Sequence, residues 1–293
     1  MSCYLSTGCF QSKDLAEIVV LACKHNFDLE LSSSLSFSAT LLEPILQTKS
    51  KVSYLIHNYF PPPAVPFVLN LASGDPDTHC CSVNHCKEAI KLCANIGVPF
   101  YSVHAGFAME MSVDMLGNSQ LQRESCISVK VDRKKAYQKF VETISSLAQF
   151  ARENQIMLLV ENNVLTLDNI ASDGTFPLLL ADVDEIKKFF NDLRQHEVGL
   201  LLDVGHAKVC AETLHVNPQS YFHELEPFIR CMHLSDNDGQ RDNNRPFSSN
   251  SWFVPFLGKF QQVPMVVEVY KCSLAEILVQ RDLLMKLTDK IPA

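Results

Sequence analysis

Four short apolar runs in the C-terminal half of the chain each end in a carboxylate or an imidazole. Their last residues are Glu161, Asp203, His233 and Glu268. A run of four to six aliphatic residues has the length of a buried parallel strand. A polar or charged group at the end of such a strand has to be paired, exposed at a rim or bound to a metal ion. Because all four endings are drawn from Glu, Asp and His, the pattern predicts one shared site.

Similar apolar runs recur along the whole chain and alternate with segments of helical periodicity, such as residues 13–26 and 132–154. The strand candidates are residues 4–8, 28–32, 52–57, 100–104, 156–161, 198–203, 229–233 and 263–269. Further helix candidates are residues 39–49, 82–96, 218–228, 251–260 and 273–287, together with one that begins at Asp182 or Asp184. Ser82 is the expected cap of the helix over 82–96.

Strand candidates that alternate with helix candidates predict parallel βαβ units. Eight such units in 293 residues have the size of a (β/α)8 TIM barrel, and we expect one domain over residues 1–293 with long loops after strands 3, 4 and 5. A doubly wound sheet is the alternative, which is disfavoured because no Gly-x-Gly-x-x-Gly follows any strand. The C-terminal strand ends of a barrel meet at one face. His57 and His104, which end the third and fourth strand candidates, would join the other four endings there.

The four strand-end side chains form a hard ligand set of mostly oxygen atoms. Such a set suits Mn²⁺, Mg²⁺ or Co²⁺, and also Zn²⁺ if the site is compact. A divalent ion with open positions can bind two neighbouring sugar oxygens and stabilise the charge of an enediolate. Glu161 and Glu268, from strands five and eight, are placed to flank a substrate, one removing a proton and the other returning it. The predicted chemistry is metal-dependent epimerisation or isomerisation of a sugar or sugar phosphate.

Other polar residues near the strand ends are candidates for ligand contact. His206 lies three residues after Asp203, so that Asp-x-x-His brings two ligand types together after an apolar strand. Arg241 and Lys271 follow strands seven and eight and are candidates for contact with an anionic or hydroxyl-rich substrate, although a surface loop residue can also have no role. His57 and His104 can equally be histidines that only make hydrogen bonds at strand ends.

Charge and cysteine content limit the partners and the compartment. The formal net charge of −8 and the lack of any run rich in Lys or Arg argue against nucleic acid and membrane as partners. The 11 cysteines are an odd number, many lie in apolar or helical stretches, and the N-terminus lacks the pattern of a signal peptide. We therefore expect reduced cysteines in a cytoplasmic protein. The apolar, proline-rich residues 59–72 are a candidate homodimer interface or an active-site lid.

The strand endings resemble those of the xylose isomerase-like TIM-barrel superfamily, which includes sugar phosphate isomerases and epimerases and the family 2 apurinic endonucleases. The similar segments are Leu-Val-Glu-Asn-Asn ending at 163, Leu-Leu-Asp-Val-Gly-His ending at 206, Met-His-Leu-Ser-Asp-Asn-Asp-Gly beginning at 232, and Val-Val-Glu-Val ending at 269. The resemblance implies that Glu161, Asp203, His233 and Glu268 bind one divalent metal ion. It also implies that the two glutamates are the acid–base pair.

The same resemblance implies that His206 binds a substrate oxygen or a further metal ion. His57 and His104 match positions that bind an additional zinc ion in the endonuclease branch. That branch carries a later Asp-x-His pair for a third zinc ion, but the stretch after His233 contains no histidine, which disfavours DNA repair. Ketose 3-epimerases usually have a second Glu six residues after the first, and Leu167 stands at that position here. The chain is therefore a divergent member, and the substrate cannot be carried over from one relative.

Three rival functions keep the predicted barrel. The first is a metal-dependent dehydratase, a lyase that removes water next to the carbonyl of a keto-polyol. The second is an apurinic endonuclease-like phosphodiester hydrolase. The third is a barrel without catalytic activity that binds a ligand or partner, and the complete set of metal ligands argues against it.

Overall fold

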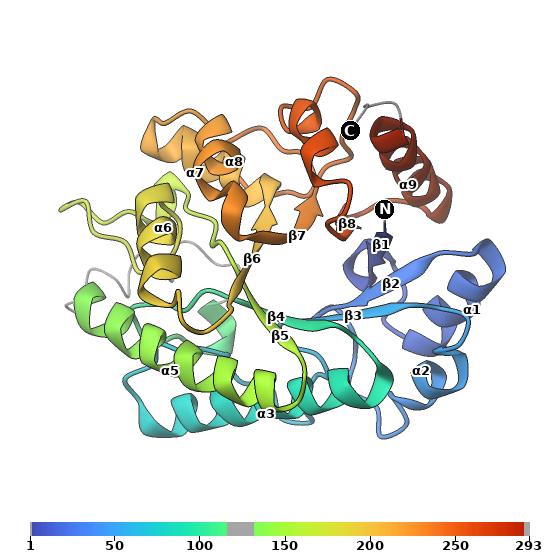
Figure 1. The fold of residues 1–293 in the computed structure, drawn as a ribbon, viewed down its shortest axis with the longest axis horizontal. Coiled ribbons are helices and arrows are strands. Elements are labelled where there is room, and N and C mark those ends of the chain that lie inside the picture. Colours follow the sequence, from blue (N-terminus) through green and yellow to red (C-terminus); the bar gives the residue numbers. More distant parts are fainter. Residues whose placement is uncertain (1, 116–131, 290–293) are drawn as a thin grey trace.

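The computed structural model describes residues 2–115 and 132–289, and in it eight parallel strands close into a barrel in the order β1 to β8 (Figure 1). The strands are β1 (Cys3–Ser6), β2 (Asp28–Leu31), β3 (Tyr54–His57), β4 (Phe100–His104), β5 (Met157–Glu161), β6 (Gly199–Asp203), β7 (Ile229–Leu234) and β8 (Met265–Val267). Parallel pairing of β1 with β8 closes the barrel. The predicted (β/α)8 TIM barrel is confirmed, and each strand candidate overlaps one of these strands.

The helices form an outer ring around the strands (Figure 1). They are α1 (Leu15–His25), α2 (Glu43–Thr48), α3 (Pro76–Ile96), α5 (Arg133–Glu153), α6 (Val183–Asp192), α7 (Val204–Leu214), α8 (Gln219–Leu225) and α9 (Leu274–Asp289). Short 3-10 helices are η1 (Thr7–Cys9), η2 (Val113–Met115), η3 (Leu167–Asn169), η4 (Glu226–Phe228) and η5 (Val254–Phe260). Within the described ranges, no helix is long and apolar enough to span a membrane.

Helix α5 shows how the sequence places the outer ring. Phe140, Ile144, Leu147 and Ala151 recur at spacings of three and four and are all fully buried. Side chains at this spacing share one face of a helix, so α5 packs that face against the barrel. Asp132 caps the helix by accepting a hydrogen bond from the Lys135 N–H, which satisfies one of the free amides of the first turn.

Strand register brings the polar strand ends to the same level. His104 is the register partner of Glu161 across β4 and β5, and Asp203 is the partner of His233 across β6 and β7. Partnered residues on adjacent strands lie side by side, so these side chains meet without help from loops. The aliphatic residues that precede them are buried on both sides of the barrel wall, as the apolar runs predict.

The predicted helices are wrong in two places, the start of α3 and the presence of α7. The helix predicted over 82–96 begins at Pro76, with Asp75 as its cap, and Ser82 is buried inside it. The Ser82 hydroxyl instead donates to the Thr78 carbonyl and accepts from the Asn70 N–H, so the polar side chain is satisfied within the helix. The sequence also predicts no helix directly after the sixth strand, whereas α7 follows β6 without a loop.

Long loops follow β3, β4 and β5, as expected, although residues 116–131 of the second lie outside the described residues. Another long connection, residues 235–253, follows β7 and was not among the long loops that the sequence predicts. These four connections extend from the C-terminal ends of their strands, the same end at which the polar strand endings meet. They therefore surround the candidate site.

Candidate metal centre

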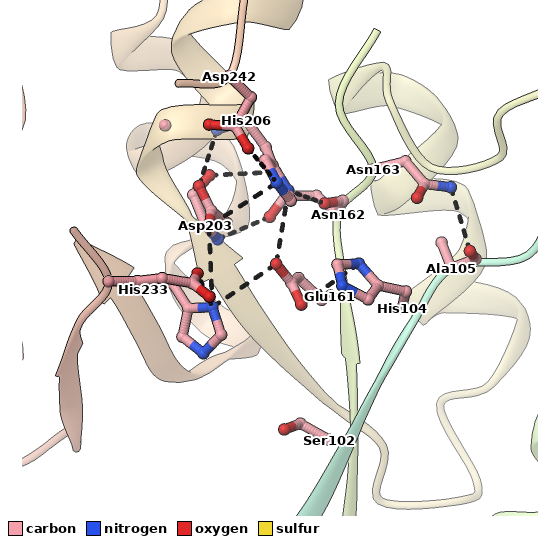
Figure 2. Close-up of polar contacts among 12 residues, drawn as sticks. Ser102, His104, Ala105, Glu161, Asn162, Asn163, Asp203, His206, His233 and Asp242 are labelled. Carbon is pink, nitrogen blue, oxygen red and sulfur yellow. Dashed lines mark hydrogen bonds and ion pairs between the residues drawn. The ribbon is translucent and has the colours of Figure 1, made fainter. Parts of the chain in front are cut away.

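The four side chains predicted as metal ligands meet at the C-terminal end of the barrel, and Figure 2 shows the Glu161, Asp203 and His233 side chains pointing toward one another. The Nδ1 atom of His233 lies 3.0 Å from Glu268 Oε2, 3.7 Å from Glu161 Oε1 and 3.7 Å from Asp203 Oδ2. All four residues are buried. One imidazole nitrogen is thus surrounded by three carboxylates from three other parts of the barrel.

Several polar atoms in this group have no hydrogen-bond partner. Glu161 Oε2, Asp203 Oδ2 and His233 Nδ1 are buried and unpartnered. The three residues each offer one ligand atom within 4.8 Å of the others. Buried polar atoms without partners are rare and unfavourable, and a bound cation would satisfy all three at once. The donor set of carboxylates and imidazole therefore fits a divalent metal ion.

His57 and His104 form a second group around the same glutamate. His57 Nε2 lies 3.2 Å from Glu161 Oε2, and His104 Nδ1 lies 3.4 Å from the same oxygen. The three residues again offer ligand atoms within 4.8 Å of one another. The other His57 nitrogen, Nδ1, is 3.0 Å from the Ser102 hydroxyl, which leaves Nε2 turned toward the glutamate. Glu161 is therefore shared by both groups and would contribute a ligand to each if each held an ion.

His206 joins the site through the start of α7. Asp203 caps this helix, because its Oδ1 accepts a 2.7 Å hydrogen bond from the His206 N–H. The His206 ring points back into the site, with Nδ1 2.8 Å from the Asn162 carbonyl and Nε2 3.2 Å from Asp242 Oδ2. In Asp-x-x-His the two carboxylate oxygens thus differ, since Oδ1 caps the helix while Oδ2 is unpartnered and lies 3.7 Å from His233 Nδ1.

Gly205 explains the glycine in the segment Asp-Val-Gly-His. A Cβ atom at this position would lie 2.7 Å from Ser235 Oγ and 3.2 Å from Oδ1 of both Asp203 and Asp242. The first distance is shorter than a van der Waals contact allows. The absence of a side chain therefore lets α7 approach the loop after β7 closely enough for Asp242 to reach His206.

Sequence reasoning missed three residues of the site. Asp242 lies in the long loop after β7, and its Oδ1 is another buried atom without a partner. Tyr270 donates a 2.8 Å hydrogen bond from its hydroxyl to Glu268 Oε1. Glu30, in the middle of β2, lies 2.8 Å through Oε2 from His233 Nε2. The available signal for Glu30 was its position between two leucines in a strand, where an unpaired carboxylate would be costly.

The two glutamates predicted as the acid–base pair differ in the direction of their pKa shifts. Burial raises the pKa of Glu161 well above its ordinary value. Burial also acts to raise the pKa of Glu268, but the charge of His233 at 3.0 Å and the hydrogen bond from Tyr270 hold it below its ordinary value. For His233, burial acts to lower the pKa, and Glu30, Glu268 and Glu161 together raise it well above its ordinary value. The His233 and Glu268 side chains, 3.0 Å apart, thus stabilise each other's charged forms, whereas burial acts against the charged form of Glu161.

The histidines of the second group are neutral. Burial, together with the neighbouring imidazoles, lowers the pKa of His57 well below its ordinary value. The same causes lower the pKa of His104 to about 3. A neutral imidazole is the form that binds a metal ion, so neither ring has to lose a proton first.

The two predicted cationic contacts are not brought into the cluster. Arg241 is exposed and lies 3.4 Å from Asp168 through its guanidinium, at the edge of the cavity above the site. Lys271 is also exposed and is not among the residues that line this cavity. The backbone of Lys271 has a positive φ of 58°, so the chain turns here directly after the eighth strand ending.

A cavity of about 720 Å³ opens above the cluster. His104, His206 and Asp242 contribute polar side chains to its lining, and Phe67 and Phe107 contribute aromatic ones. This volume is within the range of small-molecule sites, and a mostly apolar lining with a few polar groups is typical of them. The cavity borders the cluster through His104, His206 and Asp242, whereas Glu161, Asp203, His233 and Glu268 lie buried behind its lining.

Comparisons with solved structures show the same fold over almost the whole chain. A D-tagatose 3-epimerase-like protein is 17% identical, with a TM-score of 0.72 over 99% of this chain and 98% of that one. A D-psicose 3-epimerase from Clostridium cellulolyticum, solved with D-tagatose, is 12% identical, with a TM-score of 0.67 over 99% of both chains. A protein from Thermus thermophilus soaked with ZnCl2 is 16% identical, with a TM-score of 0.64 over 100% of both chains.

No curated protein matches the chain. The profile of one family, described as the xylose isomerase-like TIM barrel, matches residues 36–271. That range covers most of the chain and contains strands β3 to β8, including every residue of both candidate metal groups around Glu161. This chain belongs to the xylose isomerase-like TIM barrel family.

Proposed function

We propose that this protein is a divalent-metal-dependent isomerase or epimerase of a sugar or sugar derivative. The observation that carries the proposal is the set of unpartnered buried atoms on Glu161, Asp203 and His233, which face one another behind a cavity bordered by His104 and His206. Membership of the family and structural likeness to sugar epimerases support the choice of reaction. Glu161, Asp203, His233 and Glu268 would hold the ion.

The two glutamates are the proposed proton carriers. A divalent ion, when bound, supplies Lewis-acid polarisation of a substrate carbonyl and offsets the negative charge that develops on its oxygen. Glu161 from β5 and Glu268 after β8 approach His233 from different strands, so a substrate above His233 lies between them. One carboxylate takes the proton from the carbon next to the carbonyl, and the other returns a proton. The Tyr270 hydroxyl holds Glu268 Oε1, which fixes the orientation of that carboxylate.

The choice of metal differs between the two positions. The ligand set with one imidazole and three carboxylates suits Mn²⁺, Mg²⁺ or Co²⁺. The position between His57, His104 and Glu161 has two nitrogen donors, which favours Zn²⁺. We propose that one ion is bound by the first set, and that a second ion, where present, is bound by the two histidines.

The cavity and the cysteines support proposals about the substrate and the location of the protein. The cavity suits a small-molecule sugar, whose C–H faces can pack on Phe67 and Phe107. Residues 66–69 line the cavity, which supports a role of the 59–72 stretch in covering the site. The ten cysteines that the structure describes are free thiols, and this supports a cytoplasmic location. We propose that the chain forms a single domain. The homodimer stays a prediction from the sequence.

The reaction is tested by proton transfer. The protein, loaded with Mn²⁺, is incubated in deuterium oxide with free and phosphorylated ketoses and aldoses, and the recovered sugars are examined by mass spectrometry and NMR. Deuterium at the carbon next to the carbonyl supports the proposal. Glu268→Gln should abolish the exchange while keeping a cooperative unfolding transition. If Glu268→Gln exchanges deuterium at the rate of the wild type, the two-carboxylate mechanism is wrong.

A second candidate, metal-assisted hydrolysis of a phosphate ester, is favoured by one observation. His57 and His104 give Glu161 a second set of ligands, and paired metal ions are common in phosphoesterases. Nicking of DNA that contains an abasic site would support this function. Loss of one water from a keto-polyol, seen as a mass change, would instead support a dehydratase.

A further inference from the structure

Glu30 and His233 form a buried pair across the interior of the barrel. Glu30 lies in β2 and His233 near the end of β7, on strands that are not neighbours in the barrel. Glu30 Oε2 and His233 Nε2 are 2.8 Å apart, a normal hydrogen-bond distance, and both side chains have 0% exposure. Solvent therefore does not compete for this contact.

The pair determines which nitrogen of His233 is available to a metal ion. A neutral imidazole, the form that binds a metal ion, keeps its lone pair on Nδ1 when its Nε2 donates to a carboxylate. Nδ1 is the atom surrounded by Glu268, Glu161 and Asp203 at 3.0 to 3.7 Å, and it has no hydrogen-bond partner. The nitrogen that faces the carboxylates is thus the one that the Glu30 contact leaves free.

Burial makes a purely stabilising role for Glu30 a poor explanation. Taking a carboxylate out of water is unfavourable, and an apolar residue of similar size is often at least as stabilising as a buried ion pair. The Oε1 atom of Glu30 has no hydrogen-bond partner, so this carboxylate is not fully satisfied. The arrangement is better explained by its effect on the orientation of His233.

We propose that Glu30 is a positioning residue that holds His233 with Nδ1 turned toward the metal ion. This inference rests on the proposed function, because it assumes that His233 is a ligand. Carboxylates that bind the second nitrogen of a ligating histidine fix its tautomer and ring orientation, and their loss typically lowers metal affinity about 10- to 100-fold. Glu30 acts on the metal through His233 and does not bind it.

Two substitutions at position 30 separate positioning from packing. Glu30→Gln keeps a carbonyl oxygen that can accept the Nε2 hydrogen, whereas Glu30→Leu keeps a similar volume and removes the acceptor. Mn²⁺ affinity is measured by titration calorimetry, and the tautomer of His233 by ¹⁵N NMR of the imidazole in the protein loaded with diamagnetic Mg²⁺. We expect Glu30→Leu to lose about 10- to 100-fold in Mn²⁺ affinity, and its His233 to populate both tautomers. Glu30→Gln should retain both to within a few-fold.

Asp28→Asn is the matched control. Asp28 is an acid in the same strand, but its carboxylate accepts a hydrogen bond from the Ser53 N–H outside the site. This variant should bind Mn²⁺ like the wild type. Thermal unfolding of each metal-free variant shows whether a lost affinity follows from a damaged barrel, and Glu30→Leu should unfold no earlier than Glu30→Gln.

Three results would overturn the inference. Wild-type affinity in Glu30→Leu would show that the carboxylate has no effect on the ligand, while the proposed function would stand. Loss of one bound ion per chain in Glu30→Gln, with the remaining affinity unchanged, would show that Glu30 is itself a ligand, together with His57 and His233. A wild-type protein that binds no Mn²⁺ would overturn both this inference and the proposed metal dependence.

Discussion

Asp203 combines the cap of α7 on one oxygen with the proposed metal-binding role on the other, and substitution can separate the two. Oδ1 accepts the His206 N–H at 2.7 Å and caps α7, whereas Oδ2 is buried, unpartnered and 3.7 Å from His233 Nδ1. Asparagine keeps an oxygen that can cap the helix but removes the negative charge. Alanine removes both. The difference between the two variants in the metal-free state therefore measures the cap, and their common loss measures the metal ligand.

The expected sizes follow from these contacts. Replacing an Asp or Asn cap by Ala costs about 1 kcal/mol, so Asp203→Ala should unfold about 2 °C below Asp203→Asn in the absence of metal. Mn²⁺ at about 100 times its Kd stabilises the wild type by about 2.7 kcal/mol, which raises its Tm by about 5 °C. Neither variant should show this rise, since both lack the Oδ2 charge.

Differential scanning calorimetry with and without MnCl2 measures both effects at pH 8, where the carboxylate is ionised. The helix cap is refuted if Asp203→Ala and Asp203→Asn unfold at the same temperature without metal. The role as a ligand is refuted if Asp203→Asn retains the full rise in Tm on addition of Mn²⁺. Lys13→Ala is a suitable control, because this exposed residue is far from the site in sequence and should retain the rise.

Three further predictions concern pH, close packing and the orientation of Glu268. Burial raises the pKa of Asp203 from 3.8 to about 6, so the metal-free protein should lose stability as pH rises from about 4 to 6. Mn²⁺ affinity should increase over the same interval, because the ion competes with the proton on this carboxylate. Denaturant unfolding and titration calorimetry at each pH measure the two effects. Gly205→Ala places a Cβ atom 2.7 Å from Ser235 Oγ, so it should weaken Mn²⁺ binding in titration calorimetry even though alanine favours the helix. Unchanged affinity would mean that the loop after β7 can move to accommodate the methyl group. Tyr270→Phe removes the 2.8 Å hydrogen bond to Glu268 Oε1 and should slow deuterium exchange about 10-fold or more, with little change in Mn²⁺ affinity. An equal loss of exchange rate and of Mn²⁺ affinity would instead assign Tyr270 to metal binding.

The sequence could predict which strand endings meet, because their placement follows two simple rules. Short aliphatic runs end where a buried strand reaches the barrel rim, and parallel strands place all such ends on one face. Glu161, Asp203 and His233 follow this rule directly, and the strand register sets them level. The fold and the main cluster were therefore accessible from the sequence.

The missed residues depend on three-dimensional contacts that no local pattern records. Asp242 reaches His206 only because Gly205 permits the close approach of a long loop. Glu30 lies in the middle of an apparently ordinary strand, and its partner is 203 residues away in the sequence. Lys271 was predicted from its position after the last strand, and the structure places it outside the cluster, exposed where the backbone turns.

Anomalous diffraction from crystals soaked in MnCl2 tests the metal centre most directly. We predict a manganese peak roughly 2.0–2.3 Å from His233 Nδ1 and from carboxylate oxygens of Glu161, Asp203 and Glu268. A peak bound to other residues, or no peak at the C-terminal end of the barrel at a saturating concentration, would contradict the proposed site.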